Sequence, residues 1–333
     1  MNFTRDTNWP LWVSITFFVF ALAIVCGRGE VMATEDKSEL YFISVPVVSV
    51  FADIYDDSER ETQVLWGEPV YVVNETEDGL WKEVVVPNQY REPEGYPGWI
   101  NGRYLTKDAS SCVNLPKLDT CAQPVLRPWS LEDSGHALLV VSPQAYIYAC
   151  PDKKSAVKGR VFASSILSLR NLQPVQGNDG HSYWNIKWPH SESGLYLPYQ
   201  AGSREVLPSQ GKSLLQTARR FKGVAYLWGG LTCHGIDCSG LVYISCKLHG
   251  LIVPRDADQQ FAVGLPISRD ELEAGDLVFF GKDEDHVVHV GFYVGNGQFW
   301  DASGKHGVGL SSLDRGSYSA KYRFLGGRRY FEE

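Results

Sequence analysis

The pattern of apolar residues changes near residue 211, and this change limits the folds that the chain can adopt. Before it, residues 40–107 and 136–206 are rich in Val, Tyr and Trp and are divided into short runs by Asp, Gly, Pro and Asn. Such runs are typical of short β-strands. After it, apolar residues first recur at helical spacing, and strand-like runs follow. The sequence therefore predicts two small all-β domains and a C-terminal α+β domain, residues 211–333, with an antiparallel sheet.

The two β stretches resemble each other. Residues 81–84, Trp-Lys-Glu-Val, have a counterpart in residues 184–187, Trp-Asn-Ile-Lys. This is a weak internal repeat, and each unit is similar to a small SH3-like barrel. The stretch between them, residues 108–135, has few periodic apolar positions and contains Pro116, Pro124 and Pro128. We therefore expect it to be a linker.

The N-terminus contains one apolar run, residues 11–26. The run is short for a membrane span, which needs roughly 20 residues. Since Val31-Met32-Ala33 is an acceptable small-residue cleavage pattern, we interpret residues 1–33 as a signal peptide. An uncleaved anchor and a lipid on Cys26 are the alternatives. All three place the remainder outside the cytoplasm, where Cys112 and Cys121 can form a disulfide.

A candidate nucleophile, Cys238, lies in the segment Asp237-Cys238-Ser239-Gly240. Apolar and small side chains follow Cys238 at helical spacing, which predicts a helix from about Cys238 to Gly250. A thiol at a helix N-terminus lies near unpaired N–H groups, which favour the thiolate and can stabilise an oxyanion. The alternative is a buried structural cysteine.

His289 and Asp301 lie on two strand-like runs joined by residues 295–297, Gly-Asn-Gly. A three-residue loop would place residue 291 opposite Asp301, so that His289 and Asp301 share one face of the sheet within about 8 Å. An even-length loop without a bulge would place them on opposite faces. We predict the odd-length loop, with His289 as the general base and Asp301 holding its imidazole.

The histidines of this part of the chain allow two other interpretations. His286 lies three residues before His289 and would face the other side of the strand, so we expect it to be an exposed loop residue. A zinc site would draw on cysteines and histidines of both segments, namely Cys233, His234, Cys238, His286 and His289. Their spacing matches no common zinc pattern, and strand alternation separates the two later histidines. We therefore expect no metal.

Five ordered motifs make the C-terminal third similar to the NlpC-type cell-wall cysteine peptidases. They are YLWGG (226–230), DCSG (237–240), PRDADQQ (254–260), GDLVFF (275–280) and HVGFYVGNG (289–297). The resemblance implies a pared-down papain-like fold with a Cys–His–polar triad that hydrolyses peptide bonds in peptidoglycan stems. Transferred to this sequence, Cys238 is the nucleophile, His289 the base and Asp301 the third member. Many members have His at that third position, and an Asp can orient an imidazole as well.

The order of two barrels and a catalytic domain is similar, more narrowly, to γ-D-glutamyl-L-diamino-acid endopeptidases that act on stem peptides with a free N-terminal L-Ala. In those enzymes the first barrel closes off the groove and helps to bind the amine. The resemblance implies substrate contacts on both domains, namely Tyr226, Trp228, Asp237, Ser239 and Asp256, with Glu68 and Tyr96 from the first barrel. Arg255 either meets a substrate carboxylate or forms a structural salt bridge. Ala257 replaces a serine that family members often carry, which removes one polar contact.

The sequence thus predicts an exported, monomeric cysteine endopeptidase that needs no cofactor and acts on peptidoglycan stem peptides. Lys and Arg number 31 against 39 Asp and Glu, a net charge of −8, which argues against a nucleic-acid binder. Two alternatives remain. One is a non-catalytic wall-binding protein, and the other is an amidase or acyltransferase on the same fold.

Overall fold

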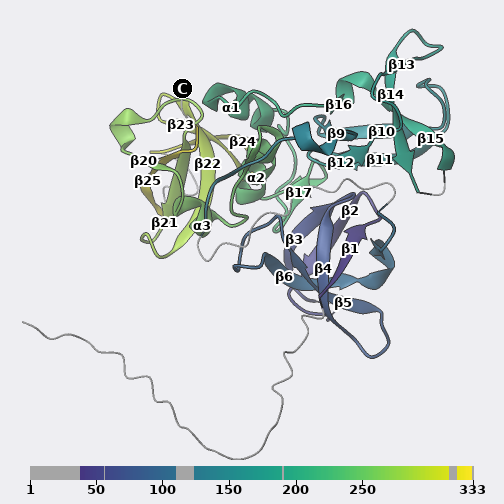
Figure 1. Ribbon diagram of the computed structural model, residues 1–333. Helices are drawn as coiled ribbons and strands as arrows, with labels where there is room; N and C mark the ends of the chain where they lie inside the picture. The colour runs from purple at the N-terminus through teal and green to yellow at the C-terminus, as the bar shows by residue number, and fades with distance from the viewer. Residues whose placement is uncertain (1–37, 56, 110–123, 190, 315–320, 332–333) are drawn as a thin grey trace, which may run out of the picture. The chain divides into compact units, whose positions relative to one another are not determined.

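A computed structural model describes residues 38–55, 57–109, 124–189, 191–314 and 321–331 (Figure 1). The predicted signal peptide and the proposed Cys112–Cys121 disulfide lie outside these ranges. Within them, Cys150, Cys233, Cys238 and Cys246 are free thiols. No helix in the described part of the chain is long and apolar enough to cross a membrane.

The first β region forms one antiparallel sheet of seven strands, in the order β3-β2-β6-β5-β4-β1-β7. Its interior is a separate cluster of buried aliphatic side chains, with Tyr96 at one side. The strands are β1 (Glu39–Ile43), β2 (Val47–Phe51), β3 (Arg60–Leu65), β4 (Pro69–Glu75), β5 (Trp81–Val86), β6 (Tyr96–Asn101) and β7 (Leu105–Thr106), with the 3-10 helix η1 (Gly102–Tyr104) before β7.

The second β region consists of two antiparallel sheets, one of five strands and one of three. The five-stranded sheet contains β10 (Gln144–Tyr148), β11 (Val157–Phe162), β13 (Val175–Gln176), β14 (Ser182–Trp188) and β15 (Ser191–Pro198). The three-stranded sheet contains β9 (Ala137–Val140), β12 (Ile166–Ser168) and β16 (Gly202–Ser203), which follows η3 (Tyr199–Ala201). Both β regions are therefore all-β as predicted, while their assignment as SH3-like barrels stays a prediction.

The described part of the predicted linker is not wholly irregular. Strand β8 (Arg127–Pro128) pairs with β19 (Leu251–Ile252) of the C-terminal region. Trp129 strengthens this contact, because its Nε1 donates to the carbonyl of Lys247 at 2.9 Å. A short 3-10 helix, η2 (Glu132–Ser134), follows. The end of this segment is thus attached to the C-terminal region.

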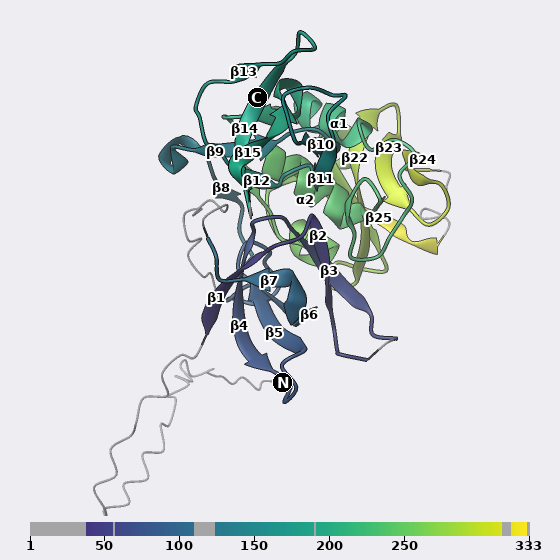
Figure 2. The same ribbon diagram turned by 90° about the vertical axis from the view of Figure 1, so that its right-hand side faces the viewer.

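The C-terminal region has helices packed on one antiparallel sheet of six strands, in the order β20-β25-β21-β22-β23-β24. This is the predicted α+β arrangement (Figures 1 and 2). The strands are β20 (Leu265–Ile267), β21 (Leu277–Gly281), β22 (Val287–Gly295), β23 (Gln298–Ser303), β24 (Gly307–Ser312) and β25 (Arg323–Arg329). The other elements are α1 (Gly211–Arg219), β17 (Leu231–Thr232), β18 (Gly235–Ile236), α2 (Cys238–Leu248), α3 (Ala257–Phe261) and η4 (Arg269–Glu271).

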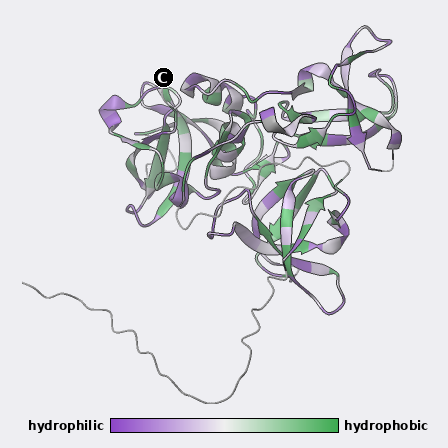
Figure 3. Cartoon of the chain, in the orientation of Figure 1, coloured by the Kyte–Doolittle hydropathy of each residue, from purple (hydrophilic) through white to green (hydrophobic). Residues whose placement is uncertain are grey.

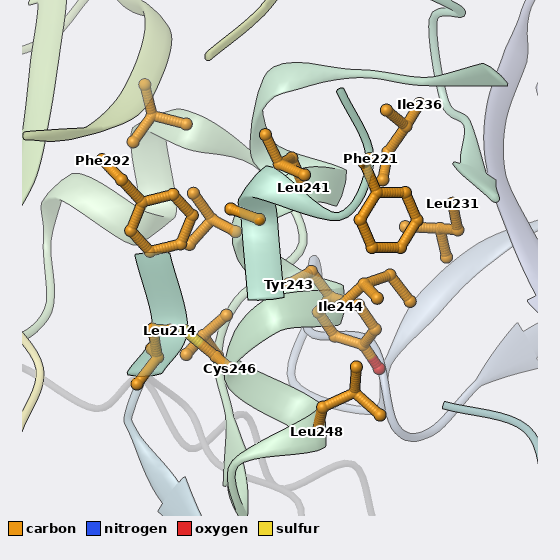
Figure 4. Packing of buried hydrophobic residues seen from close by; sticks show 14 of the residues in the cluster. Leu214, Phe221, Leu231, Ile236, Leu241, Tyr243, Ile244, Cys246, Leu248 and Phe292 are labelled. Atoms are coloured by element: carbon orange, nitrogen blue, oxygen red, sulfur yellow. The ribbon is translucent and has the colours of Figure 1, made fainter. Parts of the chain in front are cut away.

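Helix α2 is the centre of the main core, because all of its side chains are buried. A helix that is apolar on every face must be covered on every side. Phe292 of β22, Phe221 after α1 and Leu231 of β17 belong to the cluster around it (Figure 4). Each fully buried leucine or phenylalanine in such a core contributes about 1.5–3 kcal/mol. The position of Cys238 is therefore fixed by the packing of the whole helix.

Hydrophobic and hydrophilic residues alternate along many of the strands (Figure 3). Strand β6 is an example, since Tyr96, Gly98 and Ile100 are buried while Pro97 is exposed. Such alternation buries one face of a strand and exposes the other. Two polar side chains of the edge strand β3, Thr62 and Gln63, accept hydrogen bonds from Arg255 and from the Leu231 N–H of the C-terminal region.

Candidate active site

Cys238 is the first residue of α2, as predicted. Asp237 caps this helix, because its Oδ1 accepts a hydrogen bond from the Gly240 N–H at 2.6 Å. Aspartate is among the residues that satisfy the free N–H groups at a helix start best. The Cys238 side chain is only 6% exposed. The sulfur therefore lies beside helix N–H groups but has little contact with solvent.

This burial changes the expected acidity of the thiol. Burial and the neighbouring Asp237 carboxylate raise the pKa of Cys238 to about 12, although hydrogen bonds from Val290 and Ser239 act in the lowering direction. The helix start favours the thiolate, as expected from the sequence, but burial opposes this effect and outweighs it. Removing a thiol from water disfavours its charged form more strongly than the helix terminus favours it. Cys238 needs a base to ionise near neutral pH.

His289 and Asp301 meet on one face of the hairpin β22–β23. His289 Nε2 lies 2.7 Å from Asp301 Oδ2, and both side chains are fully buried. The loop itself has two residues, Asn296 and Gly297, because Gly295 pairs with Gln298. A bulge between Tyr293 and Gly295 adds the extra residue, so Phe292 pairs with Trp300 as in the predicted register. The predicted face is confirmed, and a bulge rather than a longer loop produces it.

The Asp301 carboxylate has a second partner that fixes its other oxygen. Ser311 Oγ on β24 donates to Asp301 Oδ1 at 2.9 Å, and His306 Nε2 lies 3.7 Å from the same oxygen. Burial lowers the pKa of His289, while the hydrogen bond to Asp301 acts in the raising direction. The imidazole is therefore neutral near pH 7, as a general base must be.

His286 and His234, two histidines of the zinc set that the sequence offered, have other partners in the structure. His286 is exposed and its Nδ1 lies 2.6 Å from Asp283 Oδ1, which agrees with the prediction of a surface residue. His234 instead contacts Gln144 of the second β region, with 2.7 Å between Nε2 and Oε1. Among the residues of the described ranges, no three His, Cys, Asp or Glu side chains are arranged so that they could hold a metal ion.

A pocket of about 370 Å³ opens beside Cys238. It combines residues of the first β region with residues around α2, α3 and β22. Its lining consists of Glu61, Arg91, Tyr96, Tyr226, Trp228, Asp237, Cys238, Ser239, Asp256, Ala257, Asp258, Val287 and Val288. The structure thus brings all of the predicted substrate contacts to this pocket except Glu68.

An acidic corner lies on the first-β-region side of this pocket. The Tyr96 hydroxyl is 3.2 Å from Glu61 Oε2 and 3.1 Å from Asp256 Oδ2. Burial raises the pKa of Asp256, while the charges of Arg255 and Arg91 act against this rise. Two carboxylates and an aromatic ring at one point form a suitable environment for a small cation.

The buried Arg255 side chain holds the start of α2 through Asp237 and Ser239. It is 1% exposed, and its guanidinium binds Asp237 through Nη1 at 3.1 Å and Nη2 at 2.7 Å. It also donates to Ser239 Oγ at 2.9 Å and, through Nε, to Thr62 Oγ1 at 2.9 Å. Arg255 therefore forms the structural salt bridge, one of the two predicted roles. A strand of the first β region completes the set of groups around it.

The loop before α2 also rests on the first β region. Gly229 has a φ of +68°, and a Cβ there would lie 2.9 Å from the carbonyl oxygen of Arg60. Its N–H donates to Asp237 Oδ2 at 2.8 Å, and the Leu231 N–H donates to Gln63 Oε1 at 2.9 Å. A glycine is required at this contact both by its backbone angle and by the space.

Comparison with known proteins agrees with this geometry. The model of the NlpC/P60 family matches residues 223–328. A Gamma-D-glutamyl-L-lysine dipeptidyl-peptidase of Bacillus subtilis is 31% identical over 248 residues, which cover 73% of this chain and 72% of the relative. The chain belongs to the NlpC/P60 family. It is a cysteine peptidase and, at the level of the family, a peptidoglycan hydrolase.

Two further proteins are similar to this NlpC/P60 chain over most of its length. A Gamma-D-glutamyl-L-lysine dipeptidyl-peptidase of Bacillus cereus is 29% identical over 284 residues, or 82% of this chain and 76% of the relative. The crystal structure of an NlpC/P60 family protein from Bacillus cereus superposes with a TM-score of 0.70 at 23% identity. It covers 88% of this chain and 99% of that one. The latter likeness concerns the fold alone.

Glu68 does not line the pocket of this NlpC/P60 protein, which corrects its prediction as a substrate contact. Its Oε1 forms a buried ion pair with Lys247 Nζ on α2, and its Oε2 accepts from the Leu65 N–H at 2.8 Å. Both charged side chains are at most 3% exposed. A carboxylate that is buried and paired in this way is not positioned to bind a substrate amine.

Sequence reasoning missed Glu61 and Arg91. Glu61 lies on β3, which begins at Arg60, and it is the carboxylate of the first β region that lines the pocket. Arg91 lies between β5 and β6, and only the packing of this loop against α3 brings it to the pocket. No local pattern indicates that contact.

Proposed function

We propose that this protein is an exported cysteine endopeptidase that cleaves γ-D-glutamyl–L-diamino-acid bonds in peptidoglycan stem peptides with a free N-terminal L-Ala. The observation that carries the proposal is the acidic corner of Glu61, Tyr96 and Asp256 in the same pocket as Cys238. The names of the two Bacillus relatives support a diamino acid, such as lysine, after the γ-D-glutamyl residue.

The acidic corner would bind the ammonium group of L-Ala. Two carboxylates are strong partners for an ammonium group in a partly buried site, and the Tyr96 ring closes one side. Because Glu61 and Tyr96 come from β3 and β6 of the first β region, that region would stop the peptide from extending beyond its amine. Tyr226, Trp228, Asp237 and Ser239 would line the path between this corner and the nucleophile.

The chemistry would begin with proton transfer from the Cys238 thiol to Nδ1 of His289, since Nε2 is directed at Asp301. The sulfur then attacks the γ-carbonyl, and the N–H groups at the start of α2 stabilise the oxyanion. When the C–N bond breaks, His289 donates its proton to the departing amine and a thioester remains. Water, deprotonated by His289, hydrolyses the thioester and restores the thiol. Asp301 and Ser311 keep the imidazole oriented throughout.

We further propose that the protein acts as a monomer outside the cytoplasm. Cys238, the His289–Asp301–Ser311 group and the acidic corner of the pocket all belong to a single chain. The export proposal rests on the apolar run and the cleavage pattern within residues 1–33.

The test of this function is the release of L-Ala-γ-D-Glu from the tripeptide L-Ala-γ-D-Glu-L-Lys, followed by mass spectrometry. We expect cleavage by the wild-type protein and none by Cys238→Ala, whereas Cys150→Ala, a change of an exposed thiol, should keep full activity. We also expect the N-acetylated tripeptide to be a poor substrate. Equal cleavage by Cys238→Ala would refute the assignment, and cleavage of lipid amides instead would favour the acyltransferase alternative.

A further inference from the structure

Arg91 is the one cationic side chain among the described residues that line the pocket. Four carboxylates line the same pocket, on Glu61, Asp237, Asp256 and Asp258. The Asp237 carboxylate already forms an ion pair with the buried Arg255 guanidinium. The lining of the pocket is therefore strongly acidic, and Arg91 is its one cationic side chain among the described residues.

The position of Arg91 is fixed at its backbone. Its carbonyl accepts a hydrogen bond from Gln259 Nε2 on α3 at 2.8 Å, and the carbonyl of Tyr90 accepts from the Arg255 N–H at 3.3 Å. This loop of the first β region is thus attached to the catalytic region by two consecutive backbone carbonyls. The backbone of Arg91 therefore loses little further freedom when its guanidinium binds a ligand.

The guanidinium itself is only partly engaged. Its Nη1 lies 3.2 Å from Asp256 Oδ2 and 3.3 Å from Asp258 Oδ2, while the side chain remains 40% exposed. Every contact found for this guanidinium within the described ranges uses Nη1. The edge formed by Nε and Nη2 carries two parallel N–H groups, which match the two oxygens of a carboxylate.

The proposed substrate has such a carboxylate. When D-glutamate is linked through its γ-carbonyl, its α-carboxylate stays ionised and is one residue away from the L-Ala ammonium group. A substrate anchored at Glu61 and Asp256 would bring this anion among several carboxylates, which repel it unless a cation meets it. Ala257, which lines the same pocket, offers no polar side chain for this purpose.

We propose that Arg91 binds the α-carboxylate of the γ-D-glutamyl residue and thereby makes the enzyme select D-glutamate over D-isoglutamine, its α-amide. The inference rests on the proposed function, because it assumes the same peptide in the same orientation. A purely structural Arg91, which only neutralises Asp256 and Asp258, would affect both substrates equally.

The experiment compares two tripeptides, L-Ala-γ-D-Glu-L-Lys and its α-amidated isoglutaminyl analogue, by kcat/KM. A charge-assisted contact predicts that the wild-type protein prefers the carboxylate form by about 10- to 100-fold. Arg91→Met should reduce this ratio to near one by slowing cleavage of the carboxylate peptide alone, and Arg91→Lys should restore part of it. Asp258→Asn removes one partner of Arg91 but keeps the guanidinium, so the ratio should persist.

Each outcome bears on the inference in a defined way. If the wild-type protein cleaves both peptides at equal kcat/KM, or if Arg91→Met slows both by the same factor, the inference is overturned while the proposed function stands. If the wild-type protein cleaves neither peptide, both fail. Thermal denaturation of Arg91→Met, expected near the wild-type temperature, separates loss of folding from loss of selectivity.

Discussion

The two β regions carry similar sequence patterns, yet they contact the catalytic region through different kinds of groups. The first β region contributes polar and charged side chains, including Glu61, Thr62 and Tyr96, to the pocket or to the start of α2. The second β region contributes mainly apolar side chains to the main core, such as Leu139 and Phe162. One region therefore shapes the site, and the other supports the helices behind it.

The polar contacts of the second β region lie away from the pocket. Gln144 Oε1 accepts from His234 Nε2 at 2.7 Å, and the Val141 carbonyl accepts from Arg220 Nη1 at 2.8 Å. None of these residues lines the pocket beside Cys238. A repeated strand pattern thus indicates a repeated type of domain, while the role of each copy depends on the polar side chains at its strand ends and loops.

The largest effect on folding stability is expected when the buried ion pair between Glu68 of the first β region and Lys247 of α2 is broken. Glu68→Ala leaves the Lys247 ammonium buried without its partner, and such a loss typically costs about 3–5 kcal/mol of folding free energy. Denaturant unfolding monitored by tryptophan fluorescence measures it. Glu77→Ala, an exposed change in the same region, should shift stability by less than about 0.5 kcal/mol. Equal shifts for both variants would show that the pair stabilises nothing.

The second effect concerns binding. Glu61→Gln removes one carboxylate from the acidic corner, so KM for the free-amine tripeptide should rise by roughly 10-fold or more. The N-acetylated peptide, which has no ammonium group, should be unaffected. Glu192→Gln on the exposed surface of the second β region is the matched control, with unchanged KM. A similar rise for Glu192→Gln would break the contrast between the two regions.

The third effect is on pH dependence. Because burial raises the pKa of Asp256 above the usual 3.8, this carboxylate becomes protonated and loses its attraction for an ammonium group at a higher pH than an exposed aspartate would. KM for the free-amine peptide should therefore rise, up to about 10-fold, as the pH falls through this raised pKa. The quantity to plot is KM for the free-amine peptide divided by KM for the acetylated peptide. His289, whose pKa is lowered, acts on both peptides, so its contribution cancels in this ratio. A ratio that stays constant with pH would exclude Asp256 from amine binding.

The smallest effect is expected in the second β region. Gln144→Ala removes a hydrogen bond to His234 and should lower stability by about 0.5–1.5 kcal/mol. Because neither residue lines the pocket, kcat/KM should change by less than about two-fold. Steady-state kinetics on the tripeptide provide the measurement. A large rise in KM would mean that the second β region also takes part in substrate binding.

The features that depend on local pattern could be predicted from the sequence. Asp237 before a run of helical spacing gives the start of α2, and the alternation in β22 and β23 gives the shared face of His289 and Asp301. Features that depend on packing between regions could not be predicted. Glu68 and Glu61 are both glutamates in or beside strands of one sheet, and only the docked α2 buries the former. The raised pKa of Cys238 arises from the same packing.

Gly229 joins substrate recognition to the attachment of the first β region. Because its backbone rests against Arg60 and also donates to Asp237, the loop bearing Tyr226 and Trp228 and the interface with β3 must adopt their final geometry together. Energetic coupling of this kind is reciprocal. If a peptide binds more tightly when the first β region is docked, the same peptide must stabilise that docking by an equal free energy.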